Sequence, residues 1–233
     1  MAAAIHADEH SSKTSDESAP SEEEIAESLK KLVFVPHDSG APQVTDAGGV
    51  RAVSVLPNVE LLAPERMART LSPTPTLYWH ISKAAEHAVR FTLLADDPAA
   101  IDPLLEFEID GVDKEGIYGV DLLDHGVTLT SGERYIWSVA VSTDSGNYGS
   151  DLVAQTVMEH AAAPALADIL DGIRPEERAV RLAGEGYWYD AVDVLSARIE
   201  DDEGGPWQTA RAHLLDEAGL LQAARYDWQG ATR

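Results

Sequence analysis

Hydrophobic and polar positions alternate with a period of two in short runs between residues 53 and 160. This period predicts β-strands, because successive side chains of a strand point to opposite faces. Turn-forming residues such as Asp110-Gly111 and Ser131-Gly132 separate the runs. The pattern therefore favours an immunoglobulin/fibronectin-like antiparallel β-sandwich. The predicted strands are 59–62, 76–82, 87–94, 104–110, 116–122, 134–143 and 151–160.

One predicted strand, 76–82, carries an unusual set of aromatic side chains. Tyr78 and His80 fall on one face and Trp79 on the other. We expect Tyr78 and His80 to be candidates for binding a partner, or, with Tyr118 or Tyr148, for forming an aromatic platform that binds a sugar. Ordinary packing within the sheet is the alternative.

After residue 164 the hydrophobic period becomes helical, and the last strong signal stops near Gly219. The middle of this region has the layout of one tetratricopeptide-like hairpin, in which Gly186 forms the turn and Trp188 fills the wedge between the helices. A small residue, Ala191, opens the second helix and lets the two helices approach each other. Tyr187 and Tyr189 flank the wedge, and we expect them to be free to contact a partner.

These periods divide the chain into four parts. Residues 1–31 form an acidic tail that is predicted to be disordered, with a capped helix near 21–31 as its one ordered candidate. Residues 32–160 form the β-domain, which begins with a short strand at 32–35 and a glycine-rich arm. Residues 161–219 form the helical hairpin region, and residues 220–233 are predicted to be a flexible tail.

Charge then narrows the range of functions. The chain has 17 Lys and Arg residues against 41 Asp and Glu residues, which gives a net charge of −24. Such a chain repels phosphate backbones and anionic lipids, so we expect no nucleic-acid partner. The acidity fits either adaptation to high salt or a basic partner. Cysteine is absent, and no apolar run approaches the ~20 residues that span a bilayer.

Candidate chemistry is sparse. Glu108, Asp110, Asp113 and Glu115 could supply oxygen ligands to calcium, although they also fit the solvent face of a strand and its turn. Neither a His-Glu-x-x-His motif nor a Gly-x-Ser-x-Gly elbow occurs. We therefore predict no cofactor and no enzymatic activity. The many acids leave a hydrolase with paired carboxylates as an alternative.

Several short motifs together resemble the family called domain of unknown function 928. The resemblance covers roughly residues 35–219 and implies an exported accessory protein with a β-sandwich and a helical tail, without established catalytic residues. The motifs that carry it are Gly40-Ala41-Pro42 with Gly48-Gly49, Leu61-Leu62-Ala63-Pro64, the run 70–79, Gly132-Glu133-Arg134-Tyr135-Ile136-Trp137, and the run 185–191.

Together these observations predict a non-catalytic binding or scaffold protein that meets a protein partner through its β-sandwich and its helical hairpin. We expect it to act in the periplasm or outside the cell, with the cytoplasm as the alternative. A module that binds carbohydrate or the cell envelope is the second hypothesis, and the hydrolase is the third.

Overall fold

The computed structural model describes residues 20–37, 56–143, 151–201 and 204–231. The protein is mixed α/β, and these residues form eight strands in two sheets and six helices. The strands are β1 (Val59–Leu61), β2 (Ala68–Thr70), β3 (Thr76–Ile81), β4 (Val89–Ala95), β5 (Leu105–Ile109), β6 (Gly116–Asp121), β7 (Arg134–Val141) and β8 (Leu152–His160). The helices are α1 (Glu22–Leu29), α2 (Pro164–Leu170), α3 (Pro175–Gly184), α4 (Trp188–Glu200), α5 (Gly204–Glu217) and α6 (Leu221–Ala231).

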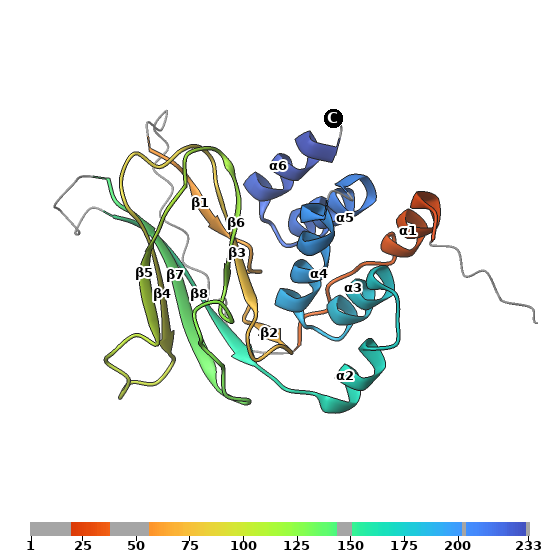
Figure 1. Ribbon diagram of the computed structural model, residues 1–233, viewed down its shortest axis with the longest axis horizontal. Coiled ribbons are helices and arrows are strands. Elements are labelled where there is room, and N and C mark those ends of the chain that lie inside the picture. Colours follow the sequence, from red (N-terminus) through yellow and green to blue (C-terminus); the bar gives the residue numbers. More distant parts are fainter. Residues whose placement is uncertain (1–19, 38–55, 144–150, 202–203, 232–233) are drawn as a thin grey trace, which may run out of the picture.

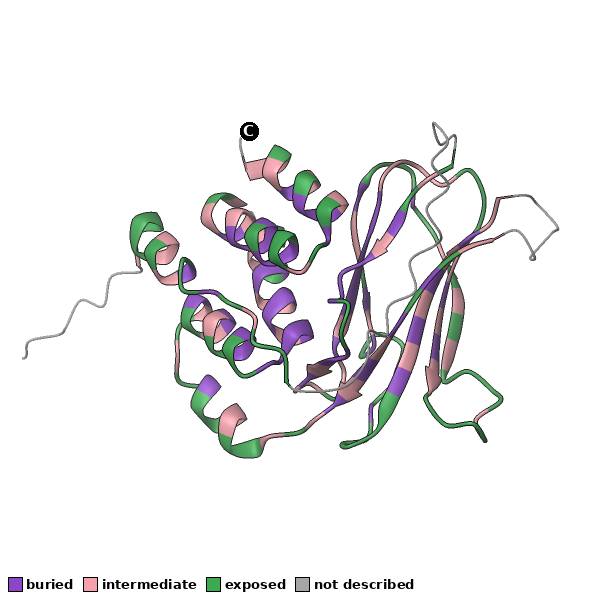
Figure 2. Cartoon of the chain, turned by 180° about the vertical axis from the view of Figure 1, so that it is seen from behind, coloured by how far each residue is buried: buried purple, intermediate pink, exposed green. Residues whose placement is uncertain are grey.

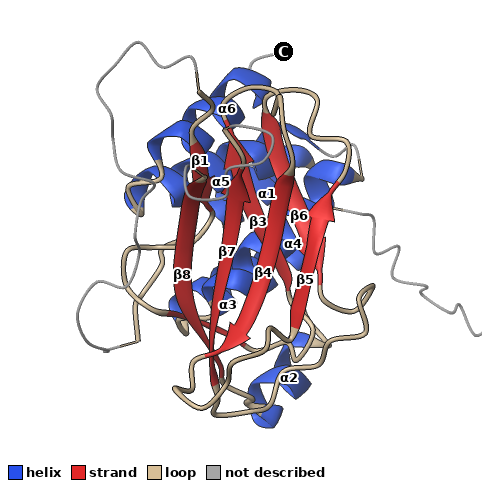
Figure 3. Cartoon of the chain, turned by 90° about the vertical axis from the view of Figure 1, so that its left-hand side faces the viewer, coloured by secondary structure: helices blue, strands red, loops and turns tan. Residues whose placement is uncertain are grey.

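The elements stack in three layers (Figures 1 and 3). The outer layer is a five-stranded sheet in the order β2-β8-β7-β4-β5, and the middle layer is a three-stranded sheet in the order β1-β3-β6. The helices cover the far side of the three-stranded sheet (Figure 1). The small sheet therefore lies between two apolar layers.

This position explains why β3 is buried on both faces. Its residues Leu77 to Ile81 are all buried, whereas β4 alternates between buried positions and partly exposed ones such as Arg90 and Thr92. Figure 2 shows buried positions along the strands of both sheets and on the helices. A strand covered on both sides tolerates few charged side chains, and β3 has none.

Each of the seven predicted strands is present, with ends within two residues of the prediction. The prediction of purely antiparallel sheets is wrong at one edge, because the additional strand β2 pairs in parallel with β8, Ala68 opposite Met158. β2 has only three residues, which is too short to give a periodic signal.

The predicted first boundary is also wrong. Residues 32–35 form no strand but run past the helices, where the Val35 N–H donates to the Ala183 carbonyl at 3.1 Å. The end of the acidic tail is ordered as α1, and Leu29 of α1 is buried. An apolar face that packs on α3 and α5 offsets the low hydrophobicity of its sequence. The rest of the predicted tail, residues 1–19, and the glycine-rich arm at 38–55 lie outside the described residues.

The predicted flexible tail after residue 219 is instead helix α6, as far as residue 231. A buried ion pair holds it: Arg211 of α5 donates from Nε and Nη2 to both carboxylate oxygens of Asp227, each at 2.8 Å. The remaining Arg211 amine, Nη1, donates to the Ser196 hydroxyl of α4 at 2.8 Å. Both charges are buried but fully paired, so the ion pair ties three helices together.

We predict that Arg211→Ala lowers the free energy of unfolding by about 3–5 kcal/mol, because Asp227 is left as an uncompensated buried charge. Arg181→Ala is the control, since it breaks an exposed i,i+4 pair with Glu185 and should cost under about 1 kcal/mol. Urea unfolding measures both values. Equal losses in the two variants would show that the buried pair does not anchor α6.

Candidate functional site

The first turn of α4 bonds the helical layer to the β-structure. The Trp188 indole N–H donates to the Leu62 carbonyl, just after β1, at 2.8 Å. The Tyr189 hydroxyl accepts from the Trp137 indole N–H of β7 at 3.2 Å. Sequence reasoning assigned Trp188 to the wedge between two helices, and the structure shows that it also joins the hairpin to the sheet layer. Trp188, Tyr189 and Ala191 are all buried.

Asp190 completes this junction. Its two carboxylate oxygens accept from the backbone N–H groups of Leu71 and Ser72, in the turn after β2, at 2.7 and 2.9 Å. Burial raises the pKa of this carboxyl to about 6, and the two backbone hydrogen bonds act in the opposite direction. The residue therefore serves as a cap for a turn more than 110 positions away in the chain.

The two candidates on β3 both face the helical layer. The Tyr78 hydroxyl donates to Asp193 Oδ1 of α4 at 3.1 Å, and burial raises its pKa. His80 lies under α6, with its ring 5.6 Å from that of Tyr226 and its Nε2 3.8 Å from a Glu115 oxygen. Burial lowers the pKa of His80 to about 4, so the imidazole is neutral at pH 7.

Gly186 forms the turn between α3 and α4 with φ +84°. A Cβ at this position would lie 3.1 Å from the Val35 carbonyl oxygen, in the segment 32–37 that crosses the turn. Phe34 of the same segment packs edge-on against Trp188, with ring centroids 4.9 Å apart. Both the backbone angle and the crossing segment require glycine here.

The expectation that Tyr78, His80, Tyr187 and Tyr189 are exposed to a partner is wrong, because all four are buried. The hairpin and the sheet bury these side chains against each other, an arrangement that periodicity within one element does not show. The predicted sugar platform loses Tyr78 and His80 for the same reason, Tyr118 is only partly exposed, and Tyr148 lies outside the described residues.

The calcium candidates do not converge with other acids. Among the residues that the structure describes, no group of three or more His, Asp or Glu side chains could hold a metal ion. Glu108, Asp110, Asp113 and Glu115 are exposed along β5 and the turn that follows it, which fits the solvent-face interpretation.

The surface instead offers a groove between α1 and α5 with a volume of about 650 Å³. Its floor is apolar and includes Leu29, Leu32 and Ala210, which are buried. Its charged rim consists of Glu22 and Glu23 in the first turn of α1, Lys30 after α1 and Glu217 at the end of α5. The remaining lining residues are Ala26, Pro206, Thr209 and His213.

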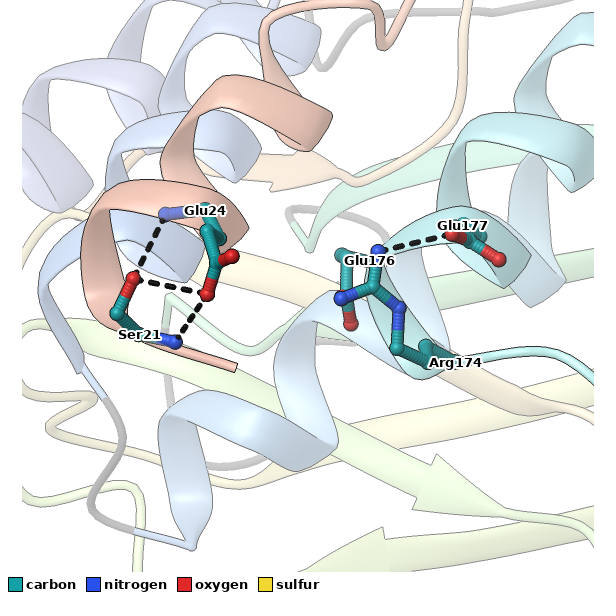
Figure 4. Close-up of polar contacts among 5 residues, drawn as sticks. All are labelled: Ser21, Glu24, Arg174, Glu176 and Glu177. Carbon is teal, nitrogen blue, oxygen red and sulfur yellow. Dashed lines mark hydrogen bonds and ion pairs between the residues drawn. The ribbon is translucent and has the colours of Figure 1, made fainter. Parts of the chain in front are cut away.

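The α1 wall of the groove is fixed by a capping box (Figure 4). The Ser21 hydroxyl accepts from the Glu24 N–H at 3.3 Å, and the Ser21 N–H donates to Glu24 Oε2 at 2.9 Å. The bond from the Ser21 N–H, and a second one from the Ser21 hydroxyl to the same oxygen at 3.0 Å, lower the pKa of Glu24. The neighbouring start of α3 is fixed by Arg174, which pairs with Glu176 and Glu177 (Figure 4). Both helix starts are therefore defined locally.

The groove is acidic at its rim. Glu22, Glu23 and Glu217 are exposed, while the one lysine, Lys30, is already paired with Glu27 at 2.7 Å. An apolar floor with a charged rim suits the burial of apolar side chains between flanking charges. Sequence reasoning missed this groove because its two walls lie about 180 residues apart in the chain. The capping signal at Ser21 predicted the helix that forms one wall, but not the groove itself.

We predict that Gly186→Ala destabilises the protein by about 1–3 kcal/mol, because alanine is strained at positive φ and its methyl group meets the crossing segment. Gly184→Ala is the matched control, since a Cβ there meets nothing within 4 Å and alanine favours a helix. Thermal unfolding compares the two variants. Equal melting temperatures would contradict a steric role of Gly186.

The raised pKa of Asp190 predicts a pH dependence of stability. The folded state holds the Asp190 proton more tightly than the unfolded state, so this stabilisation is complete below about pH 4 and is lost as the pH rises through about 6. The loss is about 3 kcal/mol, since a tenfold change in proton affinity is about 1.4 kcal/mol.

The measurement is the difference in unfolding free energy between the wild type and Asp190→Asn, from pH 4 to pH 7. It should shrink as pH rises, whereas the difference for Gly184→Ala, which removes no titratable group, should stay flat. His80, whose pKa is lowered to about 4, destabilises the folded state toward low pH. This contribution is the same in the wild type and the variant, so it cancels in the difference. A difference that grows with pH would mean that the Asp190 pKa is depressed.

None of the described helices has both the length and the apolar character needed to cross a membrane. Comparison with curated proteins gives no match. Among solved structures, the crystal structure of an engineered protein from the Northeast Structural Genomics Consortium is 18% identical, with a TM-score of 0.30. That match covers 46% of this chain and 20% of the engineered protein. The overlap is too small to define a common fold.

The sequence model of one family covers both sheets and the helical layer from α2 to most of α6. It spans residues 46–227 and therefore includes the junction around Asp190 and the α5 wall of the groove, but not α1. Because the match covers well over half of the chain, the protein belongs to the family described as Domain of Unknown Function (DUF928).

Proposed function

We propose that the protein is a non-catalytic binding or scaffold protein that holds a positively charged segment of a partner protein in the groove between α1 and α5. The observation that carries this proposal is the groove itself, which combines a volume of about 650 Å³, an apolar floor and an acidic rim. The net charge of −24 supports a basic partner, because long-range attraction speeds the encounter.

The surroundings of the titratable groups support binding over catalysis. Two buried acids, Glu176 and Asp227, are engaged by arginines. Asp190 and Asp193 accept hydrogen bonds within the junction. These acids stabilise the fold. The groove, at about 650 Å³, is larger than two other hollows of about 220 and 300 Å³.

The packing of aromatic side chains favours a protein partner over a glycan. Every phenylalanine, tryptophan and tyrosine in the described part of the chain is buried or partly buried. Sugar-binding sites use exposed aromatic faces for stacking, whereas a protein segment needs apolar floor and complementary charge.

We further propose that the β-part is a variant of the immunoglobulin-like sandwich and that α3 and α4 form a tetratricopeptide-like hairpin. Two layered sheets and the glycine turn at Gly186 support this classification. The family resemblance supports a site of action outside the cytoplasm.

The test fills the groove without changing charge. Thr209→Trp places an indole on the α5 wall, and Thr92→Trp makes the same change on the outer face of β4. Partners captured by the wild type after cross-linking are identified and purified, and their Kd values are measured for each variant. We expect Thr209→Trp to weaken binding at least about tenfold and Thr92→Trp to leave it within about twofold.

Circular dichroism confirms that both variants are folded. Partner binding that survives in Thr209→Trp, or is lost equally in Thr92→Trp, rules out the groove as the binding surface. Turnover of a glycan or peptide substrate by the wild type would overturn the non-catalytic assignment.

A further inference from the structure

The groove also indicates the form of its occupant. We infer that the partner segment is an amphipathic α-helix of about three turns, with an apolar stripe and lysine or arginine residues at both ends of that stripe. This inference rests on the proposed function, since it specifies the partner of the same groove.

The walls of the groove exclude a strand. Both walls are α-helices: α1, and the part of α5 that follows its non-helical residue Gly205. The backbone N–H and C=O groups of such helices are paired within the helix except at the ends. An extended peptide binds by adding backbone hydrogen bonds to a sheet edge, and these walls provide no such edge. A strand would therefore bury unpaired backbone groups, whereas a helix satisfies its own.

The dimensions of the groove fit a helix. The lining residues of α5 are Pro206, Thr209, Ala210, His213 and Glu217. Their spacing of three to four residues marks one face of the helix, about 16 Å long at 1.5 Å per residue. Ala26 and Ala210 are small, so a third helix can approach α1 and α5 at the usual separation of about 8–10 Å.

The acids of the rim set the charge of the occupant, since the one lysine of the rim, Lys30, is paired with Glu27. Glu22 and Glu23 belong to the first turn of α1, and Glu217 belongs to the last turn of α5. The carbonyl end of the α5 dipole adds negative potential beside Glu217. An occupant with cations at both ends of its apolar stripe pairs with this rim, while an acidic one is repelled.

The test uses three synthetic peptides of about 14 residues with blocked ends. The first places leucines at helical spacing in an alanine background, with two lysines at each end. The second peptide is identical except that two central alanines are replaced by proline, which prevents a helix. The third replaces lysine with glutamate. Affinities are measured by calorimetry at about 0.05 M and 0.5 M salt.

Two triple variants separate local charge from total charge. Glu22→Gln, Glu23→Gln and Glu217→Gln neutralise the rim, while Glu106→Gln, Glu108→Gln and Asp110→Asn neutralise three exposed acids along β5. Both sets raise the net charge by the same amount.

We expect the helical lysine peptide to bind the wild type and the β5 variant equally, and the rim variant about tenfold more weakly at low salt. The proline and glutamate peptides should each bind at least about tenfold more weakly. Thr209→Trp should abolish binding of the helical peptide, which places it in the groove.

Failure of this inference is distinct from failure of the proposed function. Equal binding of the proline peptide, equal losses in both triple variants, or no binding of the helical peptide at millimolar concentration would each overturn the helical, basic occupant. A natural partner that is still lost on Thr209→Trp would leave the groove as the binding surface in all three cases.

Discussion

The fold depends on the junction that the first turn of α4 makes with the β-structure. Trp188, Tyr189 and Asp190 are consecutive, and each bonds to a different part: the segment after β1, strand β7, and the turn after β2. An isolated helical hairpin cannot bury its own apolar face. The junction supplies the missing surface, and it also gives the three-stranded sheet its second apolar cover. Loss of this contact would expose both layers at once.

The same junction decides which parts of the surface remain for partners. The aromatic side chains of β3 and of the α3–α4 turn are buried inside the molecule. The segment 32–37 then crosses the turn at Gly186 and leads back to α1, which places α1 beside α5. The groove therefore exists because the N-terminal segment is held against the helical layer. Its α1 wall lies outside the residues that match the family.

Charge has two separate roles in this structure. In the interior, Arg211 and Asp227 form a fully hydrogen-bonded pair that orders α6, and the Asp190 carboxyl is withdrawn from water at a cost that its two N–H donors partly offset. At the surface, the excess of acidic residues gives the chain a net charge of −24, which attracts cationic groups over long range. At the groove, the acidic rim lies beside an apolar floor. This combination distinguishes the groove from the rest of the acidic surface.

The sequence by itself determined the local elements. Period-two runs located seven strands, Ser21 and Glu24 marked the start of α1, and Gly186 marked the turn, because each signal depends on neighbouring residues alone. The absence of charged residues from β3 indicates burial on both faces, although the alternation of its residues suggested that the face with Tyr78 and His80 is exposed. Only the tertiary structure decided that Tyr78, His80, Tyr187 and Tyr189 face inward, that Arg211 orders the C-terminal helix, and that α1 and α5 form a groove. These outcomes rest on contacts between residues that are far apart in the chain, and no periodicity within one element contains that information.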